Sequence, residues 1–226
     1  MARVAILRHS RGTPPGRALS WAQERGHVVQ IYDLDLGSPL PKLEDFDALI
    51  SLGGPMNCDD EARWPWLRDE KILLAEAIQA KRVVLGLCLG AQLIARSQGA
   101  AVRPNTHWES GWHKVSVRDE YLGEQELFVF QWHRDTFELP SSAQRMATNS
   151  VTENQAFRLS DRVVGTQFHP ETEATWVEAL IVDPDQPPDG PYVQREGQLR
   201  AGLAYLPTQQ AWLDRLMRQM FEAAGI

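Results

Sequence analysis

The segment Gly86-Leu87-Cys88-Leu89-Gly90 places a cysteine between two glycines, after an apolar run and before a helical pattern. This Gly-x-Cys-x-Gly order is the nucleophile-elbow pattern with cysteine in place of serine. Side chains two residues from the nucleophile would collide on so sharp a turn, which explains Gly86 and Gly90. The turn also places Cys88 at a helix N-terminus, where free N–H groups favour a thiolate. We expect a nucleophile here; a buried core cysteine with incidental glycines is the alternative.

A thiol nucleophile needs a base, and the base needs an orienting group. Among the six histidines, His169 alone has a carboxylate in a suggestive local frame, since Pro170 fixes the backbone before Glu171. His169 follows an apolar strand pattern and precedes a helix, so it should share a sheet edge with Cys88. Taken alone, His-Pro-Glu is better explained as a turn with an acid at a helix N-terminus. Combined with the elbow cysteine, it favours a Cys88–His169–Glu171 triad.

A third candidate segment, Gly53-Gly54, directly follows another apolar run. Two glycines allow close approach of a substrate and leave backbone N–H groups free. The N–H groups of Gly54 and Leu89 would together form an oxyanion hole with two donors. An ordinary turn between a strand and a helix is the simpler interpretation of Gly-Gly-Pro.

The elements that must position these residues follow from hydrophobic periodicity. Apolar β-branched runs predict strands over 3–8, 27–32, 47–52 and 82–86. Helical patterns predict one helix that ends near Arg25 and two further helices over 66–80 and 89–98. This alternation predicts an α/β fold with three layers, in which helices cover both faces of a mostly parallel, flavodoxin-like central sheet.

The second half of the chain changes character. Further strands are predicted, some antiparallel and added on one side of the sheet, over 112–118, 127–132, 144–149 and 163–168. A helix should follow over 172–181, then a loop-rich segment over 183–206 and a C-terminal packing helix over 207–224, with Thr208 as its N-cap. We expect residues 1–226 to form a single domain.

Composition excludes several classes of protein. The 226 residues carry 23 Lys and Arg against 30 Asp and Glu, a net charge of −7, and no dense basic run that would bind nucleic acid. No apolar run approaches the roughly 18–20 residues that cross a bilayer, and the N-terminus is too charged for a signal peptide. Two cysteines, Cys58 and Cys88, fit a reducing compartment, so we expect a cytoplasmic protein.

Taken in order, the motifs at 53–55, 86–92 and 167–171 resemble those of class I glutamine amidotransferases. Segments 109–112, 130–137 and 154–157 are similar to a stand-alone subgroup that resembles the glutaminase domain of GMP synthase and includes γ-glutamyl peptidases. The resemblance implies the fold of that family. It further implies that no metal or organic cofactor takes part.

The same resemblance implies roles for individual residues. Cys88 attacks the γ-amide of glutamine or a γ-glutamyl compound and forms a γ-glutamyl thioester, which water hydrolyses. His169 acts first as base and then as acid, and Glu171 orients it. Gln92 matches the family's substrate-contacting glutamine. Further candidates for substrate binding are Gly53, Trp132 and His133; a packed aromatic and a solvated histidine are nearly as good an explanation of the last two.

Three functions remain open. In the first, the protein is a glutaminase that delivers ammonia to a separate synthase subunit. In the second, it is a γ-glutamyl peptidase that acts on glutathione-like substrates without an acceptor. In the third, it is a non-catalytic relative. A PfpI-like protein also carries an elbow cysteine, but the late His-Pro-Glu argues against it. Two departures concern the pocket: Arg134 stands where the subgroup usually has a small residue, and Cys58 follows the oxyanion loop. We expect Cys58 and Cys88 both to flank the pocket, which makes them candidates for an inhibitory disulfide.

Overall fold

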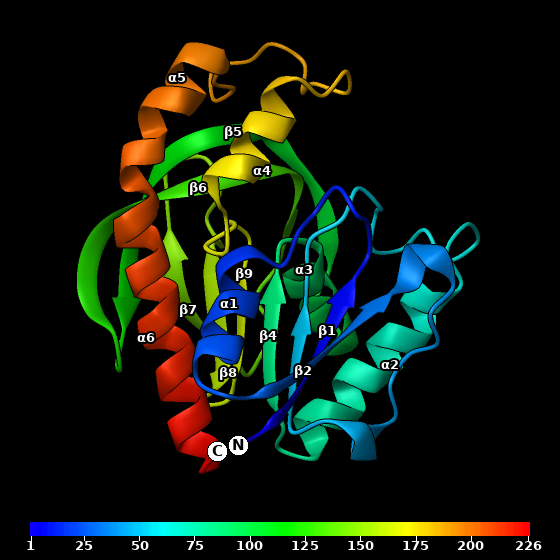
Figure 1. Cartoon of the computed structure of the whole chain (residues 1–226). Helices are drawn as coiled ribbons and strands as arrows, with labels where there is room; N and C mark the ends of the chain where they lie inside the picture. The colour runs from blue at the N-terminus through cyan, green and yellow to red at the C-terminus, as the bar shows by residue number, and fades with distance from the viewer.

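The computed structural model describes residues 1–226 and contains one nine-stranded sheet in the order β2-β1-β3-β4-β9-β8-β7-β5-β6 (Figure 1). The strands are β1 (Arg3–Arg8), β2 (Val28–Asp33), β3 (Ala48–Ser51), β4 (Val83–Leu87), β5 (Val102–Asp119), β6 (Gly123–Phe137), β7 (Gln144–Thr148), β8 (Ala156–Ser160) and β9 (Val163–Thr166). The helices are α1 (Gly16–Glu24), α2 (Trp66–Gln79), α3 (Leu89–Ser97), α4 (Ala174–Ile181), α5 (Glu196–Ala201) and α6 (Leu206–Ala224). Short 3₁₀ segments are η1 (Leu34–Leu36), η2 (Leu43–Asp45) and η3 (Gly202–Tyr205).

The sheet is parallel on one side and antiparallel on the other. Strands β2, β1, β3, β4 and β9 pair in parallel. Strands β8, β7, β5 and β6 pair antiparallel, beginning from the β9 edge. The predicted parallel sheet with added antiparallel strands is therefore confirmed.

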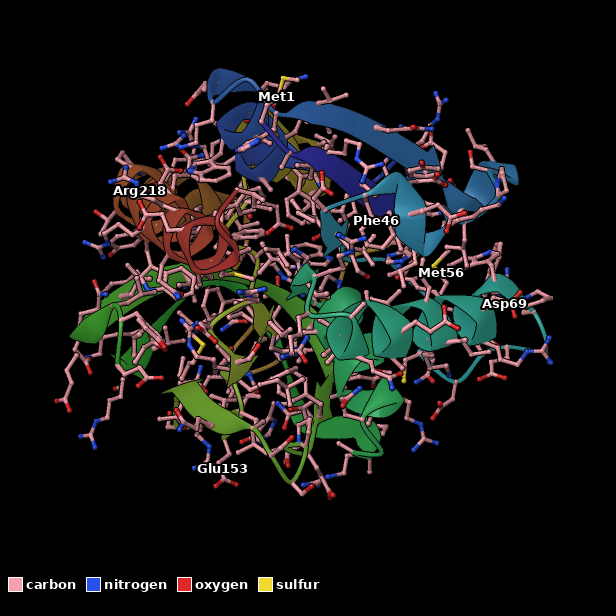
Figure 2. All side chains as sticks on the ribbon, turned by 90° about the horizontal axis from the view of Figure 1, so that it is seen from below. Met1, Phe46, Met56, Asp69, Glu153 and Arg218 are labelled. Carbon is pink, nitrogen blue, oxygen red and sulfur yellow. The ribbon has the colours of Figure 1, made fainter.

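Helices cover both faces of the parallel strands, as the continuous apolar runs predict. In β1, Val4 and Ile6 belong to a core cluster that includes residues of α1 and α6. Their neighbours Ala5 and Leu7 belong to a second cluster with residues of α2 and α3. Seen from below, Arg218 on α6 and Asp69 on α2 lie at opposite edges of the molecule (Figure 2). No helix in the structure combines the length and apolarity that a membrane span requires.

Several predicted elements need correction. The strands predicted over 112–118 and 127–132 are only parts of the long β5–β6 hairpin. The predictions missed β8, and the segment 183–206 contains α5 and η3 as well as loop. Helix α6 starts at Leu206 directly after η3, with Tyr205 at its N-cap, so the cap predicted at Thr208 is wrong. Pro207 lies in the first turn, where its missing N–H costs no helical hydrogen bond.

The parallel strands bring three loops to one edge. Ser51 of β3 pairs with Gly86 of β4, and Leu87 of β4 pairs with Thr166 of β9. The residues that follow these three strands therefore leave the sheet side by side at its carboxyl edge, where open α/β sheets bind ligands. That edge holds Cys88, His169 and the Gly53-Gly54 turn.

Candidate active site

Cys88 lies in a strained turn between β4 and α3. Its φ of 52° and ψ of −103° are rarely adopted by a residue with a side chain, and its N–H donates to Thr166 O over 2.8 Å. A Cβ on Gly90 would lie 2.1 Å from Ser51 O, and one on Gly86 would lie 2.6 Å from Gly90 C. The flanking glycines are therefore required by close backbone packing, as the sequence pattern predicts.

His169 and Glu171 form a buried pair after β9. The Nδ1 atom of His169 lies 2.8 Å from Oε1 of Glu171, and both side chains are almost fully buried. Burial alone would lower the pKa of His169, but the negative charge of Glu171, together with that of Cys88, raises it to about 10. The His169 ring packs edge-to-face against the ring of Trp176 at a centroid distance of 4.9 Å. These contacts hold a protonated imidazole beside the sulfur of Cys88.

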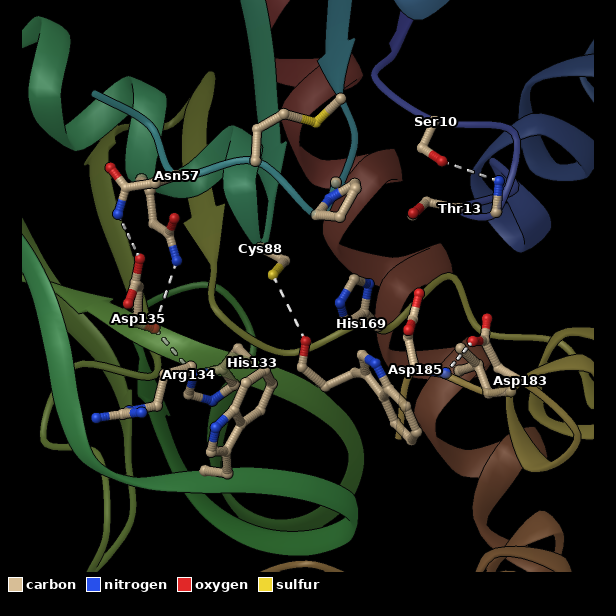
Figure 3. Close-up of a pocket in the computed structure, with 18 of the residues that line it drawn as sticks. Ser10, Thr13, Asn57, Cys88, His133, Arg134, Asp135, His169, Asp183 and Asp185 are labelled. Carbon is tan, nitrogen blue, oxygen red and sulfur yellow. Dashed lines mark hydrogen bonds between the residues drawn. The ribbon is translucent and has the colours of Figure 1, made fainter. Parts of the chain in front are cut away.

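Gly53 permits the approach of the cysteine and the histidine. A Cβ at Gly53 would lie 2.7 Å from Cε1 of His169 and 3.5 Å from Cβ of Cys88. The two side chains therefore lie next to each other across this glycine, and Figure 3 shows both facing the pocket. Gly53 itself is buried and does not line the cavity.

Two backbone donors lie near the sulfur. The N–H groups of Gly54 and Leu89 take part in none of the hydrogen bonds of the turns, loops and caps. A Cβ on Gly54 would lie 3.0 Å from Cδ2 of Leu89, so the two residues adjoin, and Gly54 lines the cavity. Neither N–H group is committed to another backbone oxygen of these segments, so both are free to donate to a ligand.

A cavity of about 560 Å³ opens beside Cys88 (Figure 3). Residues of the loops 10–13 and 54–57, three tryptophans and three aspartates contribute to its lining, which consists of Ser10, Gly12, Thr13, Gly54, Pro55, Met56, Asn57, Cys88, Gln92, Trp108, Trp132, His133, Arg134, Asp135, His169, Trp176, Leu180, Asp183 and Asp185. No group of three His, Cys, Asp or Glu side chains comes together in a metal-binding arrangement.

The other predicted substrate-binding residues also line this cavity. Gln92 donates from Nε2 to Asp135 O at 3.3 Å and to Gln167 Oε1 at 3.2 Å. The carbonyl oxygen of Trp132 lies 4.0 Å from Sγ of Cys88. His133 is buried, with Nδ1 3.0 Å from Asp135 O, so the interpretation of a solvated histidine is wrong.

A buried carboxylate that the sequence did not single out supports His133. Oε2 of Glu109 lies 3.3 Å from Nε2 of His133. Asn149, Thr152 and Gln155 donate further hydrogen bonds to the same carboxylate. Burial alone would raise the pKa of Glu109, but the contact with His133 and the hydrogen bonds from Thr152 and Asn149 lower it. The sequence signal that could have identified Glu109 is its position in the Glu-Ser-Gly-Trp segment at 109–112.

Gln167 is a second residue without a predicted role. Its Nε2 donates toward Sγ of Cys88 at 3.5 Å, while its Oε1 accepts from Gln92. It stands two residues before His169, so the motif that located the histidine also contained it. Gln167 thus connects the sulfur to the residue that the family resemblance associates with substrate.

Cys58 lies away from the site. Its side chain is fully buried in the core cluster beneath α2 and α3, does not line the cavity, and both cysteines are free thiols. Burial, followed by the negative charge of Asp59, raises the pKa of Cys58 to about 12. The expectation that Cys58 and Cys88 both flank the pocket is therefore wrong, and with it the basis for an inhibitory disulfide.

Comparisons with known proteins agree with this geometry. A family model described as "Glutamine amidotransferase class-I" matches residues 19–182. The glutamine amidotransferase-like protein YfeJ of Salmonella typhimurium is 30% identical over 79% of this chain and 80% of its own length. The glutamine-hydrolysing GMP synthase subunit of Saccharolobus solfataricus is 32% identical over 61% of this chain and 73% of its own length. Gamma-glutamyl peptidase 3 of Arabidopsis thaliana is 28% identical over 57% of this chain and 56% of its own length.

Solved structures extend the likeness to nearly the whole chain. The crystal structure of a glutamine amidotransferase from Methylobacillus flagellatus superposes with a TM-score of 0.90 and is 28% identical. The superposition covers 97% of this chain and 94% of that one. It therefore includes the antiparallel strands and the C-terminal helix as well as the parallel core.

Proposed function

The chain belongs to the class I glutamine amidotransferase family, and from that premise we propose that it hydrolyses the γ-amide bond of glutamine or of a γ-glutamyl compound. Cys88, His169 and Glu171 are the proposed catalytic triad. The observation that carries the proposal is the His169 ring, which contacts Glu171 at 2.8 Å and lies beside Cys88. A thiol, an imidazole and a carboxylate in this order form the general arrangement for acyl transfer.

The first half-reaction transfers the glutamyl group to sulfur. His169 first takes the proton of the Cys88 thiol as base. The thiolate then attacks the γ-carbonyl carbon, and the electron pair of the carbonyl moves onto its oxygen, which accepts from the N–H groups of Gly54 and Leu89. When this tetrahedral species collapses, the C–N bond breaks. The leaving nitrogen takes the proton of His169, whose raised pKa keeps that proton available at neutral pH. Ammonia or an amine departs, and a γ-glutamyl thioester remains.

The second half-reaction uses water. His169, now neutral, accepts a proton from water as the oxygen attacks the thioester carbon. The C–S bond breaks, glutamate leaves, and the resulting thiolate again lies beside an imidazolium. Glu171 retains its negative charge throughout and stabilises that cation. The cycle consumes one water and needs no residue outside the described site.

The size of the cavity favours a second candidate within the same chemistry. A space of about 560 Å³ accommodates a leaving group larger than ammonia. Together with the similarity to gamma-glutamyl peptidase 3, this supports hydrolysis of glutathione-like compounds without an acceptor. The similarity to a glutamine-hydrolysing GMP synthase subunit instead supports a separate synthase partner that consumes ammonia. Two free cysteines fit a reducing compartment, and we extend the proposal to the cytoplasm.

Glutamate release from glutamine and, separately, from glutathione tests the proposal. We expect wild-type protein to release glutamate from at least one substrate and Cys88→Ala to release none. Cys58→Ala is the matched control and should retain wild-type kcat, because Cys58 lies outside the cavity. Activity on glutamine alone that rises with a partner would reject the peptidase alternative. Equal hydrolysis by Cys88→Ala and wild type would reject the mechanism.

A further inference from the structure

A second histidine–glutamate pair lies behind the Gly53-Gly54 turn. His9 follows β1, and its side chain is fully buried. Its ring stacks on Trp66 at a centroid distance of 5.4 Å and an interplanar angle of 7°. Glu70, on α2, is equally buried. The mechanism above uses neither residue, although a buried charged pair is costly unless its partners are well placed.

The hydrogen-bond partners fix the protonation of His9. Nδ1 lies 3.2 Å from Gly53 O, and Nε2 lies 2.9 Å from Oε2 of Glu70. Carbonyl and ionised carboxylate oxygens only accept hydrogen bonds, so both ring nitrogens must donate. Ser51 donates from Oγ to Oε1 of Glu70 at 2.7 Å and so completes the carboxylate's partners. His9 is accordingly an imidazolium: burial alone would lower its pKa, but Glu70 raises it.

The carbonyl that His9 contacts belongs to the peptide that supplies the Gly54 N–H. This peptide is planar and trans, so its C=O and its N–H point in opposite directions. A donor fixed on Gly53 O therefore also fixes the direction of the Gly54 N–H. The packing is close, because a Cβ on Gly54 would lie 2.8 Å from Cβ of His9. Glycine otherwise leaves this peptide free to rotate about its flanking bonds.

We infer that His9, held by Glu70, is a positioning residue that aims the Gly54 N–H at the oxyanion. The inference rests on the proposed function. His9 acts through the backbone and does not touch the substrate. Its positive charge behind the carbonyl also polarises the peptide, which strengthens the N–H as a donor. The benefit arises only when negative charge develops on the substrate oxygen, so it belongs to the transition state rather than to substrate binding.

The test compares His9→Leu and His9→Asn with wild type on whichever γ-glutamyl substrate the wild type hydrolyses. His9→Leu should lower kcat roughly 10- to 100-fold with KM changed less than about twofold, as for a weakened oxyanion donor. His9→Asn, whose amide can still donate to Gly53 O, should recover part of the loss. Alkylation of Cys88 by iodoacetamide should keep its wild-type rate in both variants, because alkylation forms no oxyanion.

His27→Asn is the matched control. His27 is a half-buried histidine directly before β2, where its Nδ1 accepts from Ala2 N at 3.1 Å, so its loss should leave kcat unchanged. If His9→Leu does not fold, Glu70→Gln takes its place. That variant keeps the side-chain volume, removes the charge, and should lower kcat about threefold to tenfold with unchanged alkylation.

The outcomes separate this inference from the proposed function. An active wild type with unchanged kcat in the His9→Leu or Glu70→Gln variant overturns the positioning role. So does an equal loss in kcat and in the alkylation rate of Cys88, which would indicate general damage to the site. A wild type inactive on every γ-glutamyl compound instead overturns the proposed function, and the inference with it.

Discussion

His169 holds its proton because Glu171 contacts one ring nitrogen and Cys88 lies near the ring. The local motifs reveal all three residues, since each lies in a short segment whose spacing has a mechanical reason. His9 and Glu70 are different, because they lie 61 residues apart, one directly after β1 and the other on α2, and meet only in the folded protein. No local pattern marks either of them. Sequence reasoning therefore found the proposed triad and missed His9 and Glu70, which are inferred to position the Gly54 N–H.

Glu171→Gln tests the charge behind the imidazole. The amide keeps the volume of the side chain but removes the negative charge, so the pKa of His169 should fall. We expect kcat to drop roughly 10²- to 10⁴-fold with little change in KM. Steady-state kinetics on glutamine or glutathione measure this. Glu178→Gln is the control, because it affects only a surface pair with Arg200. A kcat of Glu171→Gln within a few-fold of wild type would contradict the proposed role of Glu171 in orienting and stabilising His169.

At the scale of elements, hydrophobic periodicity located every strand and helix of the parallel half. It missed β8 because a buried arginine, Arg158, stands in the middle of that strand, paired with Asp119 at 2.8 Å. It missed α5 because the helix is short and follows a Pro- and Asp-rich loop. The helix is stabilised by a tertiary contact, in which Trp112 donates from Nε1 to Leu199 O over 2.9 Å. Such partners are distant in sequence and leave no local periodicity.

Close packing at the elbow between β4 and α3 predicts that a side chain at Gly90 lowers the stability of the fold. Gly90→Ala places a methyl group against the backbone of Ser51, so β3 and α3 must separate. We expect the free energy of unfolding to fall by roughly 1–3 kcal/mol and activity to fall with it. Gly197→Ala in α5 is the matched control, because a Cβ there meets nothing within 4 Å. It should be neutral or stabilise by roughly 0.4–1 kcal/mol.

Urea unfolding of both variants measures the two free energies. Equal stability of Gly90→Ala and wild type would show that the elbow tolerates a side chain. A destabilised Gly197→Ala variant would show that the contrast does not come from close packing.

At the scale of the whole molecule, the parallel strands gather three loops at one edge, and the antiparallel strands complete the wall of the pocket. The residues after β3, β4 and β9 supply the glycine turn, the cysteine and the histidine, while β6 supplies Trp132 and His133. The sequence predicted the shared edge, because parallel strands end together. It did not predict the wall formed by β5 and β6, whose length depends on their pairing with each other.

The buried ionised histidines make stability depend on pH. The pKa of His169 rises from its ordinary 6.5 to about 10 in the fold, so the folded state binds this proton more tightly than the unfolded state. Its contribution is complete below about pH 6.5 and is lost as the pH rises toward 10. We expect Tm to fall over this range more in wild type than in His169→Gln. Parallel Tm curves for the two proteins would contradict this assignment.

The most direct test of the central claim is mass spectrometry of the protein quenched with acid during turnover of glutamine or glutathione. The mechanism predicts one γ-glutamyl group, bound as a thioester, on the peptide that contains Cys88. The peptide that contains Cys58 is an internal control and should carry none, because that thiol is buried away from the cavity. Continued turnover without a glutamyl group on Cys88, and with Cys88→Ala as active as wild type, would contradict the account.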